Sequence, residues 1–373
     1  MSFDELKKQL KTLEATDRRR ELVPRDTRGT MIIEADGREL INFGGNDYLG
    51  LASQQYALQT KSGSTASALV CGWTADHQRL ADALANLEGT EAAVLFPTGY
   101  AACSGTVATL AEVDDLILSD QLNHASLIDG CRLSRAYCVV YPHRNLEFVE
   151  KTLKSRRANV ARAWIVTDGV FSMDGHVAPL RELCTLAEKY DAILIVDEAH
   201  GTGVLGQNGS GVCEALGVKK HVPIRIGTLS KAIGGQGGFV AGPQVVIDYL
   251  INRCRSLIYS TSLAPPAVQA GLDGLKAIAA QPQRREHLAE ISRLVRQRLS
   301  IVCNDVEARV PIIPLVVGED HEAVRRSARL RESGFFVPAI RPPTVPAGTA
   351  RLRISLTAIH DLNSVESLIK HLI

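Results

Sequence analysis

The chain has 373 residues and a formal net charge of +1, and 45% of its residues are hydrophobic. This composition is typical of a globular protein with room for two domains. A nearly neutral chain gives no sign of nucleic acid or an anionic membrane as a partner. No stretch approaches the roughly 18 apolar residues of a membrane span, and the N-terminus lacks the apolar region of a secretory signal. We therefore expect a cytoplasmic protein.

Metal and disulfide sites are not indicated by the sequence. The eight cysteines are dispersed without a C-x-x-C pair, and the ten histidines show no H-E-x-x-H pattern. We expect the cysteines to be small buried residues in a reducing compartment, and we expect no metal.

From the N-terminus, the pattern predicts an amphipathic helix in "MSFDELKKQLKTLEATDRRREL" and a hairpin in "GTMIIEADGRELINF" that turns at Asp36-Gly37. Apolar runs of strand length follow, with amphipathic helical segments between most of them. We predict strands at 92–96, 115–119, 136–141, 163–169, 192–198, 223–228 and 237–242, and helices at 99–111, 124–134, 145–155 and 179–189.

Strands that are apolar on both faces and separated by helices predict an α/β fold with a mainly parallel sheet covered by helices. Beyond about residue 264 the pattern predicts a smaller α+β domain, with helices near 264–280, 283–302, 320–333 and 360–372 and strands at 310–318, 335–340 and 350–356. We therefore divide the chain into an N-terminal arm (1–45), a large domain (46–263) and a small C-terminal domain (264–373).

Polar residues follow three strands of the predicted sheet, and ligands of such sheets bind beyond the carboxyl ends of the strands. They are Asp168 after the first of these strands, Asp197 and His200 after the second, and Thr228 and Lys231 after the third. The pattern therefore predicts a functional site at one edge of the sheet.

Asp197 belongs to "IVDEAHGTGVLG". In isolation it would serve as a helix N-cap, but His200 and the glycines that follow indicate a turn lining a cavity. A carboxylate in such a place suits a protonated heterocyclic nitrogen.

Lys231 stands in the largely uncharged run "RIGTLSKAIGGQGGFVAG", whose spacing does not fit the phosphate loop G-x-x-x-x-G-K-[ST]. One interpretation is a salt-bridged surface lysine, and the other is an amine that forms a Schiff base. A lysine for an aldehyde, a carboxylate for a pyridinium and hydroxyls for a phosphate together meet the demands of pyridoxal 5′-phosphate.

A series of motifs resembles, in order, those of the α-oxoamine synthases, a family of fold-type-I pyridoxal-phosphate enzymes. The motifs are "NFGGNDYLGL", "NHASLIDG", "DGVFSMDGHVAPL", "VDEAHGTGVLG", "GTLSKAIGG" and "IRPPTVPAGTARLRISLTA", and the resemblance covers roughly residues 40 to 360. It implies a homodimer with shared active sites.

The resemblance implies cofactor contacts residue by residue. Lys231 would hold the cofactor as a Schiff base and move the proton at the substrate Cα. Asp197 would face the pyridine nitrogen, His200 the phenolic oxygen and His124 the face of the ring. Further contacts are expected from Ser172, from the amides of Gly99 and Tyr100 at a helix start, from Thr228, and from Thr261 of a second subunit.

For the substrate, Arg341 of "RPPT" would hold a carboxylate with its guanidinium fork, and Thr344 would lie close to it. Asn46 and one of the arginines 18–20, with Arg18 taken first, would help to hold the substrate or its acyl chain. The alternative for the arginine run is a solvated helix face.

The implied reaction condenses an L-amino acid with an acyl-CoA, releases CO₂ and CoA, and gives an α-amino ketone. "RPPTVPAGTARLR" favours the biotin-pathway members, which use L-alanine and a pimeloyl thioester. Two alternatives stay open: a relative that uses glycine or serine with another acyl-CoA, and a non-catalytic partner subunit, which would lack a lysine at position 231.

The sequence departs from the family pattern in two places. The stretch between "GLASQQYALQ" and "SGSTASALV" is shorter than in the family, and Asp168 stands where the family often has Glu. The shortened stretch leaves the choice of acyl chain open.

Overall fold

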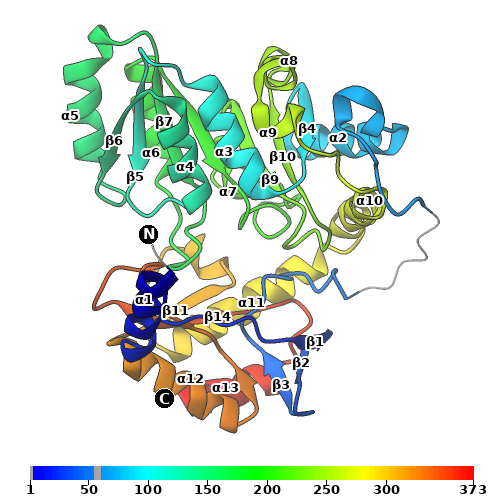
Figure 1. The fold of residues 1–373 in the computed structure, drawn as a ribbon, viewed down its shortest axis with the longest axis vertical. Coiled ribbons are helices and arrows are strands. Elements are labelled where there is room, and N and C mark those ends of the chain that lie inside the picture. Colours follow the sequence, from blue (N-terminus) through cyan, green and yellow to red (C-terminus); the bar gives the residue numbers. More distant parts are fainter. Residues whose placement is uncertain (1–2, 54–59) are drawn as a thin grey trace. The chain divides into compact units, whose positions relative to one another are not determined.

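The computed structural model describes residues 3–53 and 60–373, and the chain divides into two compact units (Figure 1). Unit 1 comprises Met1–Ser53, Met173–Gly175 and Glu286–Ile373, and unit 2 comprises Gln54–Ser172 and His176–Arg285. Residues 54–59, which belong to the shortened stretch, lie outside the described residues.

Unit 2 is built on a seven-stranded sheet with the order β4-β10-β9-β8-β7-β5-β6 (Figure 1). β10 runs antiparallel to both of its neighbours, and the other strands run parallel to one another. The predicted α/β fold is confirmed, and each predicted strand agrees with the structure to within one residue at each end. The strands are β4 (Ala92–Phe96), β5 (Leu116–Asp120), β6 (Tyr137–Tyr141), β7 (Ala163–Asp168), β8 (Ala192–Asp197), β9 (Ile224–Thr228) and β10 (Gly238–Gly242).

Helices connect these strands. The four predicted helices are present as α3 (Gly99–Leu110), α4 (Ala125–Ser134), α5 (Leu146–Arg156) and α6 (Leu180–Lys189). The other helical elements of unit 2 are η1 (Ala68–Gly72), α2 (Ala75–Glu88), η2 (Arg157–Asn159), α7 (Val212–Ala215), η3 (Lys219–His221), α8 (Gln244–Arg253), α9 (Arg255–Ile258) and α10 (Pro265–Ala280), and α11 (Gln283–Arg298) begins at its end.

The central strands are mostly apolar, because helices cover both faces of a parallel sheet, and the buried Arg225 within β9 is ion-paired with Glu88. The ends of the strands are left open. β5, β7, β8 and β9 accordingly end in Asp120, Asp168, Asp197 and Thr228. The core formed by strands and helices includes Phe96, Ile117, Val166, Ile195, Ile226 and Val240 from the sheet and Ala102, Val107 and Leu127 from α3 and α4.

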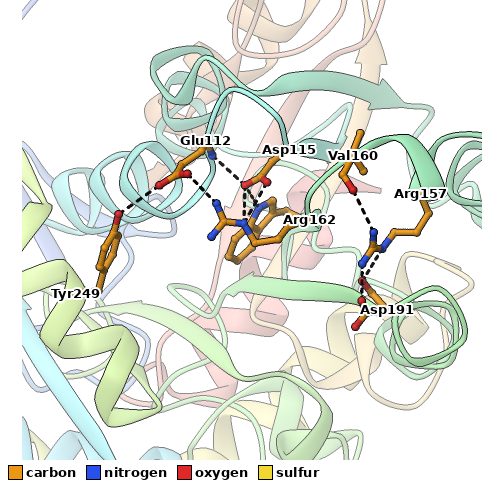
Figure 2. A network of polar contacts seen from close by, with 8 residues as sticks. Glu112, Asp115, Arg157, Val160, Arg162, Asp191 and Tyr249 are labelled. Atoms are coloured by element: carbon orange, nitrogen blue, oxygen red, sulfur yellow. Dashed lines mark hydrogen bonds and ion pairs between the residues drawn. The ribbon is translucent and has the colours of Figure 1, made fainter.

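Polar contacts hold the amino ends of two strands at the opposite edge of the sheet (Figure 2). The Nε of Arg162, just before β7, lies 3.1 Å from both carboxylate oxygens of Asp115, just before β5, and the Trp164 indole donates to Asp115 at 2.9 Å. Burial by itself would raise the pKa of Asp115, but the amide of Glu112 together with the indole and the guanidinium holds that pKa below its usual value. These contacts tie β5 to β7 and fix their relative register.

Unit 1 contains two small sheets and flanking helices. The first sheet has the order β1-β2-β3-β12 and the second, which is antiparallel, β11-β14-β13. The strands are β1 (Arg25–Arg28), β2 (Met31–Glu34), β3 (Glu39–Asn42), β11 (Ile312–Gly318), β12 (Phe335–Phe336), β13 (Ala339–Ile340) and β14 (Ala350–Ser355), and the helical elements are α1 (Phe3–Ala15), η4 (Glu307–Arg309), α12 (Asp320–Glu332) and α13 (Leu362–Leu372).

Two details of unit 1 differ from the prediction. The single strand expected at 335–340 is divided into β12, which pairs with β3, and β13, which pairs with β14. Pro338 lies between them, and its missing N–H interrupts a sheet ladder. β1 was not predicted, because all four of its residues are exposed and carry no apolar pattern. The predicted hairpin is present, and Gly37 in its turn adopts a φ of 83°.

The boundaries of the two compact units differ from those of the predicted domains. Residues 46–53 lie in unit 1, whose β3 pairs with β12, and α10 lies in unit 2, where it packs against α2. The division into an arm, a large domain and a small domain stays a prediction.

The described residues hold no helix with the length and apolar character needed to cross a membrane. In the same part of the chain, no cluster of three or more His, Cys, Asp or Glu side chains is arranged to bind a metal. Five of the eight cysteines are buried as expected, whereas Cys71 and Cys138 are exposed and Cys303 is half-buried.

His360, after β14, is held in its neutral form by its surroundings. Nε2 lies 3.0 Å from the carbonyl oxygen of Asn42, Nδ1 accepts the amide of Thr357 at 3.1 Å, and the ring stacks on Phe43 with centroids 4.2 Å apart. Burial lowers the pKa of His360 from 6.5 to about 4, although the Asn42 carbonyl opposes this shift.

The stability of the protein should therefore fall as the pH drops from 6.5 towards 4, because the unfolded chain then binds a proton at His360 that the folded chain does not. The loss is about 1.4 kcal/mol per pH unit, up to roughly 3 kcal/mol across the window. His360→Gln should remove the part of this slope that His360 contributes, as measured by urea unfolding at about pH 7.5 and about pH 5.

His321→Gln, a substitution of an exposed histidine on α12, provides the control and should unfold with the pH dependence of the parent. An unchanged slope in His360→Gln would show that His360 is not the titrating group.

Candidate active site

A cavity of about 230 Å³ opens in unit 2 at the carboxyl ends of its strands. Eight of the residues predicted from the sequence line it: Gly99, Tyr100, His124, Asp168, Asp197, His200, Thr228 and Lys231. They lie at or after the ends of five strands, β4, β5, β7, β8 and β9, so the topology of the sheet brings them together.

Lys231 and His200 contact each other inside this cavity. The Nζ of Lys231 lies 2.9 Å from the Nε2 of His200. Asp197 ends β8, and its Oδ1 accepts the amide of Ala199 at 2.8 Å. Because β8 pairs in parallel with β9, the turn that carries Asp197 and His200 lies beside the turn that carries Lys231.

Two carboxylates stand next to each other at the floor of the cavity, since Asp168 of β7 is in register with Asp197 of β8. Burial and the neighbouring charge of Asp197 raise the pKa of Asp168 well above its usual value, against the amide of His124 and the charge of Lys231. These surroundings thus favour the protonated form of Asp168.

His124 is the N-cap of α4, and its ring opens onto the cavity. Its Nδ1 lies 2.7 Å from the hydroxyl of Ser126, and the ring meets the edge of Tyr100 with centroids 6.3 Å apart. The atoms packed around the ring lower the pKa of His124, as does the charge of Lys231, while Asp197 opposes the shift. The imidazole is therefore neutral at physiological pH.

One end of the cavity offers amide groups to an anion. Thr98 caps α3 by accepting the amide of Ala101 at 3.0 Å, and the two amides before it, of Gly99 and Tyr100, precede the first hydrogen bond within the helix. A Cβ on Gly99 would stand 3.2 Å from the Oγ1 of Thr228, so a larger residue would crowd that hydroxyl. The start of a helix next to a hydroxyl suits a phosphate.

This donor set fits pyridoxal phosphate. A primary amine, a buried carboxylate, a neutral imidazole and a helix N-terminus line one cavity, and they match the aldehyde, ring nitrogen, ring face and phosphate of that molecule.

Two predicted cofactor contacts do not line the cavity. Ser172 is half-buried in the loop after β7, and Thr261 is exposed and forms an isolated bridge with Ser67. Their roles beside the cofactor and across a subunit interface stay predictions.

The predicted substrate residues belong to unit 1. Arg341 donates to the backbone carbonyl of Asp17. Asn46 accepts from Arg353 at 3.1 Å. Arg18 is ion-paired with Asp320 at 2.7 Å.

Among the three arginines of the predicted run, Arg20 has the contact most consistent with a substrate role. It donates to the Oγ1 of Thr344 at 3.0 Å, whereas Arg19 is paired with Glu14 at 3.0 Å. We therefore transfer the proposed role from Arg18 to Arg20.

Sequence reasoning missed four side chains with hydroxyl or thiol groups that line the cavity: Thr98, Cys103, Ser126 and Ser230. Cys103 follows Gly99 by one helical turn and so lies on the same face of α3. Ser126 follows His124 by two residues in "NHASL". Both signals were present, but only the packing of α3 against α4 gives them meaning.

Residues 38–372 match the family described as "Aminotransferase class I and II". The chain belongs to this family. The 8-amino-7-oxononanoate synthase of Anaeromyxobacter dehalogenans is 44% identical over 375 residues, with 98% of this chain and 94% of that relative covered.

Solved structures support the same assignment. A serine palmitoyltransferase from S. paucimobilis, solved with pyridoxal phosphate and myriocin bound, has a TM-score of 0.90 and 28% identity, covering 99% of this chain and 96% of its own. An 8-amino-7-oxononanoate synthase from Francisella tularensis has a TM-score of 0.73 and 28% identity, covering 89% and 96%. The predicted family, its fold and its cofactor are confirmed: this family member is a pyridoxal-phosphate-dependent acyltransferase.

We propose that the Lys231 amine holds the cofactor aldehyde and serves as the base for the substrate proton. Lys231→Ala should therefore lower turnover by about a thousandfold or more, because both roles would be lost. Borohydride reduction of the parent holoenzyme should fix the cofactor on the peptide that contains Lys231, and mass spectrometry of the variant should find no such peptide.

Lys151→Ala, which alters an exposed lysine on α5, should keep both the turnover and the labelled peptide. Labelling of a different lysine in the parent would overturn the role of Lys231.

Proposed function

We propose that this acyltransferase condenses L-alanine with a pimeloyl thioester and releases CO₂ and the thiol carrier, giving 8-amino-7-oxononanoate for biotin biosynthesis. Near full-length identity of 44% to a synthase of that name supports the proposal. The observation that carries it is the cavity in which Lys231, His200, Asp197 and His124 converge, because these groups are the ones that such a reaction requires.

When bound, pyridoxal phosphate supplies an aldehyde that links to amines and a ring that withdraws electrons from the substrate Cα. Lys231 would hold that aldehyde through Nζ. The Lys231 amine would also take the proton from the substrate Cα and return a proton to the product. His200, 2.9 Å from Nζ, orients the lysine for both tasks.

Asp197 would keep the ring nitrogen protonated, since its carboxylate is buried and lines the cavity. The ring of His124, whose pKa is lowered, would pack on the face of the cofactor without repelling its positive nitrogen. The amides of Gly99 and Tyr100, with the hydroxyl of Thr228, would hold the phosphate.

In unit 1, Arg341 binds the substrate carboxylate, with Arg20, Thr344 and Asn46 beside the substrate or its acyl chain. The Arg341 guanidinium meets a backbone carbonyl, which leaves its charge available to an anion, and this supports the assignment. We further propose a homodimer in which Thr261 serves the neighbouring site, which sedimentation of the holoenzyme tests.

A second candidate is a reaction of glycine or serine with another acyl-CoA. The serine palmitoyltransferase structure favours this candidate, because it has the same fold and its superposition covers 99% of this chain with a TM-score of 0.90. The higher identity to the biotin-pathway relative leads us to prefer L-alanine.

The two candidates are separated by following CoA release with alanine, glycine and serine against acyl-CoAs of different chain length. We expect turnover with L-alanine and pimeloyl-CoA, and 8-amino-7-oxononanoate as the product by mass spectrometry. Turnover with serine or glycine only would reject the proposed substrates while keeping the enzyme class.

Arg341→Ala should raise the KM for L-alanine by about 10- to 100-fold, because a charge-assisted hydrogen bond to the carboxylate is lost. The affinity for pyridoxal phosphate, titrated by absorbance, should stay unchanged.

The matched control is Arg325→Ala on α12, which removes an exposed arginine paired with Glu322. A KM in Arg341→Ala no higher than in this control would contradict the role of Arg341.

A further inference from the structure

Cys103 ties α3 to the carboxylate of Asp197. Its Sγ donates a hydrogen bond to the Oδ2 of Asp197 at 3.1 Å, while the Oδ1 accepts the amide of Ala199 at 2.8 Å. The two oxygens of the carboxylate are thus held by different elements, Oδ2 by a helix and Oδ1 by the turn after β8. Cys103 is itself buried and lines the cavity.

The sulfur is a donor at physiological pH. Burial, followed by the negative charge of Asp197, raises the pKa of the Cys103 thiol well above its usual value. The side chain therefore remains a protonated thiol, and its role is to donate a hydrogen bond and not to act as a nucleophile.

Ser126 stands beside this contact, towards His124. Its buried hydroxyl opposes the rise in the pKa of the Cys103 thiol and lies 2.7 Å from the Nδ1 of His124. The Nδ1 of His124 also accepts the amide of Ser126 at 3.3 Å. A chain of neighbouring side chains thus leads from the ring of His124, through Ser126 and Cys103, to Asp197.

Close packing of α3 on α4 brings the middle of this chain together. A Cβ on Gly130 would stand 2.9 Å from the Cβ of Val107 and 3.0 Å from the carbonyl oxygen of Ser104, so α4 approaches α3 more closely than a larger residue would allow. Ser126 precedes Gly130 by one helical turn and lies on the same face of α4. The glycine therefore holds the serine against the cysteine.

We propose that Cys103 is a positioning residue of the cofactor site: its thiol fixes the carboxylate of Asp197 and, through Ser126, couples that carboxylate to the ring of His124. The inference rests on the proposed assignment of Asp197 to the ring nitrogen and of His124 to the ring face. It adds a role for a side chain that touches neither the substrate nor the reacting atoms.

Loss of the thiol leaves the Asp197 carboxylate with one of these two hydrogen-bond donors, the amide of Ala199. Cys103→Ala should therefore weaken binding of pyridoxal phosphate to the apoenzyme by about tenfold, the value of one hydrogen bond to a charged group. It should also alter the visible spectrum of the holoenzyme, which reports the environment of the ring. Cys103→Ser keeps a donor on a shorter side chain and should restore most of the affinity and the spectrum.

Cys184→Ala is the matched control, because Cys184 is a buried thiol of unit 2 on α6 that does not line the cavity. It should keep the affinity and spectrum of the parent. Thermal unfolding of each apoenzyme shows whether a variant is folded. If Cys103→Ala does not fold, the cofactor affinities of Cys103→Ser, which keeps a donor, and Cys103→Val, which does not, are compared in its place.

Coupling to His124 is tested by Ser126→Ala and by the double variant with Cys103→Ala. Because both substitutions break the same chain, their effects on cofactor affinity should be less than additive. Additive effects would overturn the coupling, and an affinity in Cys103→Ala equal to that in Cys184→Ala, or no rescue by serine, would overturn the positioning role. Either result leaves the proposed function intact, since that depends on Lys231 and on the substrate panel.

Discussion

Two buried carboxylates in register, Asp168 and Asp197, are the constraint on which the active site depends. Like charges this close cannot both be ionised at low cost, so the surroundings must separate their roles. Burial and the neighbouring charge raise the pKa of Asp168 and favour its protonated form. The Asp197 carboxylate accepts hydrogen bonds from the amide of Ala199 and the thiol of Cys103. Lys231 lines the same cavity, and the cofactor ring would supply a positive partner for Asp197 when it is bound.

The helices around the sheet complete the electrostatics. α3 and α4 begin at the carboxyl ends of β4 and β5, so both direct the positive ends of their dipoles at the same edge. Gly99 and Gly130 allow close approach, one to Thr228 and the other to α3. The result is a site that favours an anion at one end, a phosphate in our proposal, and a cationic ring at the other.

Unit 1 shows why a motif alone does not assign roles to its residues. In "IRPPTVPAGTARLRISLTA", Arg351 is ion-paired with Asp174, and Arg353 donates to Ser355 at 2.6 Å and to Asn46 at 3.1 Å. These arginines have carboxylate or polar partners inside the unit, whereas Arg341 meets a backbone carbonyl. The difference in partners, which the sequence does not display, supports Arg341 as the anion-binding residue of the motif.

Local sequence patterns predicted the seven strands of unit 2 and its α/β class, because strands buried on both faces are mostly apolar. They also predicted that Asp197, His200, Thr228 and Lys231 lie at one edge of the sheet, because polar residues gather at the ends of such strands. Other features depend on contacts between distant segments, which no local pattern encodes. The division of 335–340 between two sheets, the ion pair that occupies Arg18, and the link from His124 through Ser126 and Cys103 to Asp197 arise from such contacts. The sequence pattern predicts only a core residue for a cysteine in a helix, whereas the packing of α3 in the tertiary structure places the thiol of Cys103 3.1 Å from the carboxylate of Asp197.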